Sequence, residues 1–177
     1  MKIGDRSERT KRLTVCAMLG ALGVVVLYLG SMIEVIDISM AVIASLFAIF
    51  AVIEYGAPYA WSIYAITGVL SIVLLPNKIP ALMYIFFFGF YPIIKEKIER
   101  RSSKLTQWVL KEILFNVCLI LLMVLGNYLL MIDVKSWIVI EIVFFLLANG
   151  VFPVYDVALT RLISLYIFRL RRKFRIK

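Results

Sequence analysis

Polar and charged side chains that could bind a ligand or transfer a proton lie near the two ends of the apolar stretches that dominate this 177-residue chain. One set lies in or beside the loops that follow the first, third and fifth apolar stretches. The members of this set that we single out as candidates for ligand binding are Glu34, Asp37, Tyr84, Asn127, Tyr128, Trp137 and Glu141. Carboxylates beside amide and aromatic groups can line a pocket for a small polar molecule. Acidic residues outnumber basic ones there, which favours a cationic or zwitterionic ligand; alternatively, the charges are solvated and the rings form an interfacial belt.

A second set of polar side chains stands near the opposite ends of the apolar stretches. Its principal members are Glu54, Lys95, Lys111, Asn116 and Asp156. Pairing of either lysine with Glu54 or Asp156 would offset the cost of removing these charges from water. We expect this polar layer to be structural or to form a coupling surface; a proton relay or a catalytic acid pair is the alternative.

Several groups that enzymes commonly use are missing from the sequence. There is no histidine, which is the commonest general base and metal ligand. The glycines form no phosphate-binding GxxxxGKS/T or GxGxxG loop. Cys16 and Cys118 stand within apolar stretches, where they are expected to pack as small side chains. We therefore predict a protein that is not an enzyme and that holds no metal or cofactor.

The elements that must position these side chains are membrane-spanning helices. The mean hydropathy is +0.99, and 63% of the residues are hydrophobic. A bilayer core about 30 Å thick requires about 20 mainly apolar residues per helix. We predict an all-α membrane protein, a single domain over residues 1–177 that forms a six-transmembrane-helix bundle. The predicted spans are 13–31, 38–53, 59–75, 80–94, 113–132 and 137–157.

The basic residues predict how the six spans are oriented. Of the 20 lysines and arginines, 18 lie before the first span, between the fourth and fifth, or after the sixth. An even number of spans places these three segments on one side, and basic residues mark the cytoplasmic side. Both termini are therefore predicted to be cytoplasmic. The net charge of +9 is expected to contact anionic membrane lipid and not nucleic acid.

Two cytoplasmic segments have the pattern of interfacial helices. The segment 95–111 mixes charges with apolar residues, which predicts a helix on the membrane surface that runs into the fifth span. The tail 158–177 places apolar residues near helical spacing between arginines. We expect it to continue the sixth span as a basic helical extension.

The first span carries small residues at a spacing that favours close helix packing. Ala17 and Ala21 stand four residues apart, and Gly20 lies beside them. A small-xxx-small pattern lets another helix backbone approach closely. That second helix is either a neighbouring span or part of a separate subunit, and the spacing alone leaves both open.

Taken together, these features resemble the S components of energy-coupling factor (ECF) transporters, which are their substrate-binding membrane subunits. The basic N-terminus, the small residues at 17–23, the six short spans and the amphipathic segment before span five carry the resemblance over nearly the whole chain. The stretch Phe88-Gly-Phe-Tyr-Pro-Ile-Ile-Lys95 is similar to S-component-like membrane proteins.

The resemblance implies a protein of the bacterial cell membrane that captures a vitamin or similar small solute on the outer side. The outer ends of spans four to six and the loop after span one would form the pocket. Docking through Ala17, Gly20 and Ala21 would join the chain to a coupling subunit driven by two cytoplasmic ATPases.

Two further interpretations remain open. The chain is also similar to the rod-shape-determining membrane subunits of cell-wall assembly, which have five or six spans and basic cytoplasmic segments and act as scaffolds. A proton-coupled carrier acting alone would need Glu54, Glu141 or Asp156 to titrate during transport.

Overall fold

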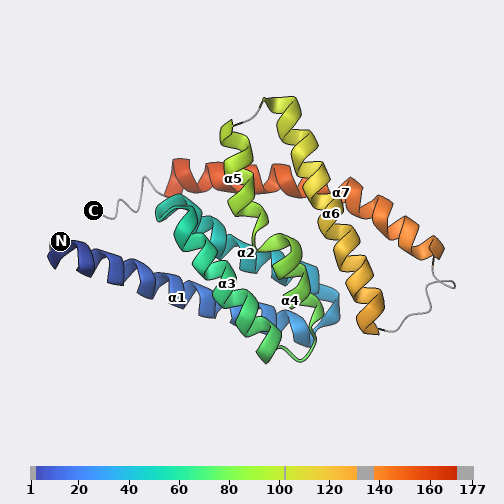
Figure 1. Ribbon diagram of the computed structural model, residues 1–177, viewed down its shortest axis with the longest axis horizontal. Coiled ribbons are helices and arrows are strands. Elements are labelled where there is room, and N and C mark those ends of the chain that lie inside the picture. Colours follow the sequence, from blue (N-terminus) through green and yellow to red (C-terminus); the bar gives the residue numbers. More distant parts are fainter. Residues whose placement is uncertain (1–2, 102, 131–137, 171–177) are drawn as a thin grey trace. The chain divides into compact units, whose positions relative to one another are not determined.

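Long helices make up nearly all of the protein in a computed structural model, which describes residues 3–101, 103–130 and 138–170 (Figure 1). The α-helices are α1 (Ile3–Met32), α2 (Asp37–Glu54), α3 (Ala57–Leu74), α4 (Ile79–Met83), α5 (Tyr91–Arg101), α6 (Lys104–Leu130) and α7 (Ile138–Leu165). A short 3-10 helix, η1 (Glu34–Ile36), leads into α2. Two π-helical turns, η2 (Tyr84–Phe88) and η4 (Tyr166–Leu170), follow α4 and α7.

Six segments of these helices are long and apolar enough to cross a membrane. They are Glu8–Met32, Asp37–Glu54, Ala57–Leu74, Ile79–Arg100, Lys104–Gly126 and Ile142–Phe168. This confirms the predicted all-α class and the six candidate transmembrane helices. The chain divides into two compact units, Met1–Gly126 and Asn127–Lys177, and each is described by itself.

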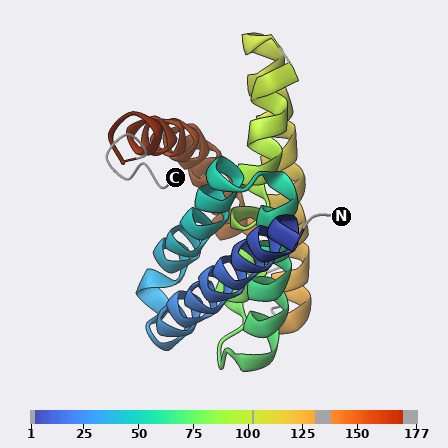
Figure 2. The same ribbon diagram turned by 90° about the vertical axis from the view of Figure 1, so that its left-hand side faces the viewer.

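In the first unit, α1, α2 and α3 pack against one another, as the two views of the ribbon show (Figure 2). Small residues permit this close approach. A Cβ atom added at Gly20 would lie 3.0 Å from the Ile66 side chain on α3. One added at Gly30 would lie 2.8 Å from Cβ of Met40 on α2. The glycines of α1 are therefore contact points for the two neighbouring helices.

The turn between α2 and α3 is very short. Only Tyr55 and Gly56 separate the last residue of α2 from the first residue of α3. Gly56 has a φ of 89°, a backbone conformation that glycine adopts without the steric cost paid by other residues. Pro58 then lies in the first turn of α3, where its missing N–H would have no helical partner.

The fourth span is broken near its middle. It consists of α4, the π-helical η2, a turn at Gly89 and Phe90, and α5. The Gly89 N–H donates to the Tyr84 carbonyl at 2.7 Å, which closes the wide π turn. Pro92 follows within the first turn of α5. Single π-helical turns of this kind are frequently found at functional sites.

The segment 95–111 differs from its prediction as one surface helix. Its first part continues the fourth span as α5 up to Arg101, and its second part begins α6 at Lys104. Charged side chains with good helix propensity extend both apolar helices beyond their apolar parts. The tail is helical through Leu170, as predicted, and its remaining residues lie outside the described ranges.

Candidate functional site

Asp37 and Asn77 meet at the end of the first unit where α1 leads into α2. Asp37 begins α2 and is only 5% exposed. The Asn77 amide donates to Oδ2 of Asp37 at 3.5 Å, while the Asn77 Oδ1 accepts from the Ile79 N–H at 3.0 Å. Lys78 donates to the Leu75 carbonyl in the same turn. The structure thus brings two of the loops singled out from the sequence into contact.

The other ligand-binding candidates are placed less completely. Glu34 belongs to η1, Asn127 and Tyr128 to α6, and Glu141 to α7, but their side chains lie outside the described residues. Trp137 lies outside the described ranges altogether. For a pocket built on these residues, the structure therefore describes the side chains of Asp37 and Tyr84.

Tyr84 lies inside the bundle and not on an open outer surface. It is 0% exposed and belongs to an apolar cluster that also contains Leu27 on α1, Ala41 on α2 and Leu75. Its ring stacks on that of Tyr64, with 6.1 Å between the centroids. Gly89 accommodates this pair, because a Cβ atom there would lie 2.7 Å from the Tyr64 ring and 2.8 Å from the Tyr84 ring. The break in the fourth span thus buries a tyrosine.

Hydroxyl groups on α3 link this helix to its neighbours. The Tyr64 hydroxyl donates to the Ile85 carbonyl of η2 at 3.0 Å. The Thr67 hydroxyl donates to the Gly20 carbonyl of α1 at 3.2 Å, so it links α3 to α1. Thr67 and Ser71 are both 0% exposed. The otherwise apolar interior of the first unit therefore contains buried hydroxyl groups where α3 packs against α1 and η2.

The small residues of the first span lie on two different faces of α1. Gly20 is buried against α3, as is Gly23, where an added Cβ would lie 3.0 Å from the Thr67 side chain. Ala17 and Ala21 are exposed, and so is Val25, one turn further along. The structure thus separates a glycine face, which packs within the first unit, from an alanine face, which the other helices of that unit leave exposed.

The polar layer contains a carboxylate that the sequence reasoning missed. Lys95 and Lys111 are 1% and 4% exposed, and both contact Oε1 of Glu99, at 3.0 and 2.6 Å. The Gln107 amide donates to the Glu99 carbonyl at 3.1 Å. Glu99 was detectable, because it stands four residues after Lys95 on a predicted helix. These contacts fasten α5 to α6 at their shared corner.

The remaining members of the polar layer are spread over other helices. Glu54 ends α2 and is partly buried, and Asn116 donates to the Glu112 carbonyl of its own helix at 3.0 Å. Asp156 lies in α7, within the second unit, and its carbonyl accepts a hydrogen bond from Thr160. Lys95 and Lys111 thus share Glu99, a carboxylate that was not among the partners predicted from the sequence.

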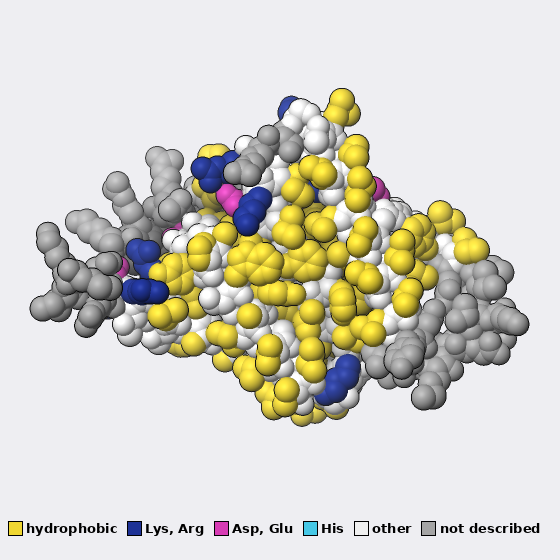
Figure 3. Space-filling model, in the orientation of Figure 1, with side chains coloured by type: hydrophobic (Ala, Val, Ile, Leu, Met, Phe, Trp, Pro, Cys, Tyr) yellow, Lys and Arg dark blue, Asp and Glu magenta, His cyan; other side chains and the backbone are white. Residues whose placement is uncertain are grey.

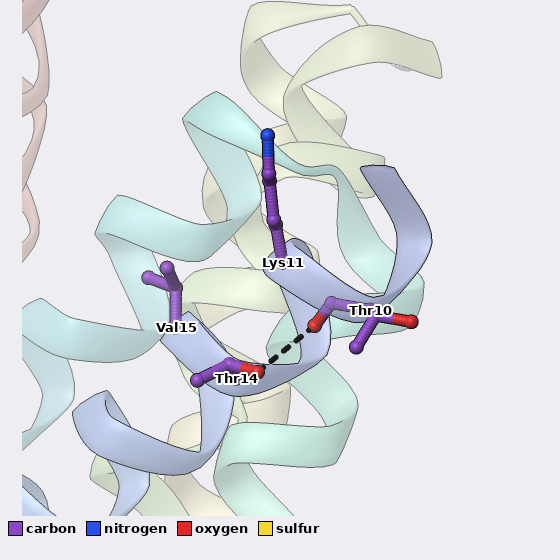
Figure 4. A pocket seen from close by; sticks show the side chains of 4 residues that line it. All are labelled: Thr10, Lys11, Thr14 and Val15. Carbon is purple, nitrogen blue, oxygen red and sulfur yellow. Dashed lines mark hydrogen bonds between the residues drawn. The ribbon is translucent and has the colours of Figure 1, made fainter. Parts of the chain in front are cut away.

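A shallow hollow of about 590 Å³ lies at the basic start of α1. It is lined by Thr10, Lys11, Thr14 and Val15 (Figure 4). The Lys11 amine points away from the hydroxyls, and the Thr14 hydroxyl donates to the Thr10 carbonyl at 3.0 Å.

The space-filling view shows apolar side chains over most of the visible face, with charged groups near its margins (Figure 3).

Comparison of the chain with known protein families, characterised proteins and solved structures returned no match. Within the described residues, no three histidine, cysteine or acidic side chains come close enough to share a metal ion.

Proposed function

We propose that this protein is the substrate-binding subunit of an ECF-type importer in a bacterial cell membrane. It would capture a vitamin or similar small solute from the outer side and dock onto a coupling subunit driven by two cytoplasmic ATPases. The observation that carries the proposal is the outward-facing pair Ala17 and Ala21 on α1. The resemblance of the sequence to S components assigns the docking role to these same positions.

The two faces of α1 support docking over purely internal packing. Gly20 and Gly23 already serve the contact between α1 and α3. Ala17 and Ala21 are not needed for that contact, since both are exposed. Helices in a membrane associate through van der Waals packing at small residues, because lipid supplies no hydrophobic driving force between them. A second protein helix is the natural partner for an exposed alanine pair.

The arrangement of charges supports a cytoplasmic location for the N-terminus and for the α5–α6 corner. Arg9, Lys11 and Arg12 precede the apolar part of α1, and Lys95 with Lys111 lies near the corner. This is the distribution expected from the positive-inside rule. The turns at Asp37 and Asn77 would then face outward, where a solute arrives.

The chain offers no nucleotide-binding loop, so import against a gradient requires an external source of energy. The coupling would come from differential contacts of two conformations with the solute and with the partner subunit. Of the proposed ligand-binding set, the structure describes the side chains of Asp37, at the turn before α2, and Tyr84, in the interior of the first unit.

The proposal is tested by isolating the tagged protein from its native membranes in mild detergent and identifying the bound proteins by mass spectrometry. The wild-type chain should retain a membrane coupling subunit and two ATPases. The double variant Ala17→Trp/Ala21→Trp should lose them by at least ten-fold, because the indoles prevent close backbone approach.

A matched control is available on α3. Val69 and Val73 are also four residues apart and exposed, at 64% and 71%, so Val69→Trp/Val73→Trp adds the same indoles to another face. This control should retain the ATPases. Equal loss in both double variants, or the absence of ATPases from the wild-type sample, would contradict the proposal. Recovery of wall-synthesis enzymes in their place would favour the scaffold function.

A further inference from the structure

Two hydroxyl groups in the interior of the first unit lack a hydrogen-bond partner among the described residues. They are the Oγ of Ser71 on α3 and the phenol oxygen of Tyr84 on η2. Both residues are 0% exposed. An unsatisfied hydroxyl in an apolar interior costs about 1–3 kcal/mol, and such groups in native proteins commonly bind an internal water molecule. Within a membrane, bulk water cannot supply the missing bond.

The behaviour of Ser71 differs from that of other hydroxyls on these helices. A helical serine or threonine ordinarily satisfies itself by donating to a carbonyl three or four residues earlier. Among the described residues, Thr14, Ser31, Ser45, Ser62, Thr160 and Ser164 do so. Ser71 makes no such bond, so its buried hydroxyl is left without a partner among the described residues.

The two groups belong to one place in the fold. Thr67, Ser71 and Leu75 follow one another at four-residue intervals, so they share a face of the helix that starts at Ala57. Thr67 is near enough to interact with the Tyr84 hydroxyl, although it does not reach hydrogen-bond geometry. Leu75 belongs to the same cluster as Tyr84. Ser71 lies between Thr67 and Leu75 on this face, one helical turn from each.

We propose that Tyr84, Ser71 and Thr67 bind one internal water molecule where η2 meets α3. Side chains one helical turn apart have Cβ atoms about 5–6 Å from each other, a distance that a water bridges with two hydrogen bonds of about 2.8 Å. The three protein groups are neutral, so they suit a neutral ligand that both donates and accepts.

The hydrogen bonds can be assigned to donors and acceptors. The Thr67 proton is already donated to the Gly20 carbonyl, so Thr67 is left to accept. The Tyr84 and Ser71 hydroxyls donate to the water, and the water donates one proton to Thr67. Three partners is the usual number for a buried water. The bound water would tie the π-helical break to α3, and through Thr67 to α1. This inference does not depend on the proposed transport function.

A double-mutant cycle with Tyr84→Phe and Ser71→Ala, measured by thermal unfolding in detergent, tests the bridge. If both hydroxyls bond one water, each single change should lower the midpoint by about 2–4 °C, and the double change by less than the sum. Ser45→Ala is the matched control, because Ser45 is a buried serine bonded within its own helix. Its effect should be additive with Tyr84→Phe. Two single changes that each raise the midpoint would contradict the bridge, because truly unsatisfied hydroxyls are better removed.

Radiolytic hydroxyl-radical labelling provides a direct readout, because bound water is itself the source of the radical. Tyr84 should be oxidised several-fold faster than Tyr91, which is equally buried at 0% exposure. Ser71→Ala should reduce the Tyr84 rate and leave the Tyr91 rate unchanged. A wild-type Tyr84 rate no greater than that of Tyr91 would overturn the proposal.

Discussion

Gly89 lies at the break in the fourth span, against the rings of Tyr64 and Tyr84. These rings are held on both sides, since Tyr84 is fully buried and the Tyr64 hydroxyl is bonded to the Ile85 carbonyl. A methyl group at position 89 would have to displace one of them. Glycine is therefore required at position 89 because a side chain would clash with the rings, whereas at position 56 it is favoured because the backbone has a positive φ.

Gly89→Ala should destabilise the protein by roughly 1–3 kcal/mol, the usual cost of forcing an extra group into a packed interior. The measurement is the thermal midpoint of the detergent-solubilised protein. Gly126→Ala is the control, because nothing lies within 4 Å of a Cβ atom at that helical position. It should leave the midpoint unchanged or raise it, since alanine favours a helix. A Gly89→Ala midpoint equal to that of Gly126→Ala would show that the rings move aside.

At the α5–α6 corner, one carboxylate contacts two buried ammonium groups. Glu99 is about one-third exposed, so its own desolvation is incomplete, but Lys95 and Lys111 are almost fully buried. Removal of the negative charge leaves both lysines with a weaker partner. Because Lys95 and Glu99 lie on α5 and Lys111 lies on α6, loss of the charge should weaken the packing of these two helices.

Glu99→Gln should lower the stability by roughly 1–3 kcal/mol, the range for loss of a partly buried charged hydrogen bond. Glu96→Gln removes a carboxylate from the same helix and serves as the control. The midpoint of Glu99→Gln should fall clearly below that of the control. Limited proteolysis should also cut the corner near Ser103 sooner in the Glu99 variant. Equal midpoints would mean that other contacts fix the corner.

For the molecule as a whole, the six candidate spans and the charge distribution predict one topology, with both termini and the α5–α6 corner on the cytoplasmic side. With Cys16 and Cys118 replaced by alanine, a cysteine at Ser103 should react with a membrane-impermeant maleimide only after the cytoplasmic side is made accessible. A cysteine at Lys78 should react in intact cells, because its turn is on the opposite side in this topology. Labelling of both positions from the outside would contradict the assigned orientation.

The sequence predicted the number of helices well, because apolar length alone specifies a transmembrane helix. It predicted one surface helix over residues 95–111, whereas the charged residues up to Arg101 continue the fourth span as α5 and α6 begins separately at Lys104. It also could not decide the role of Ala17 and Gly20. These positions lie on neighbouring parts of the helix surface, and only the placement of α3 determines which one is covered.

The short turn at Gly56 has a consequence for how the protein reaches its membrane. Only two residues connect α2 and α3, which is too short a linker for one helix to insert into the membrane independently of the other. Each has 18 residues, or about 27 Å at 1.5 Å per residue, close to the thickness of a hydrocarbon core. We expect the two to enter the bilayer together as a preformed hairpin during biosynthesis, so that the insertion machinery handles them as one unit.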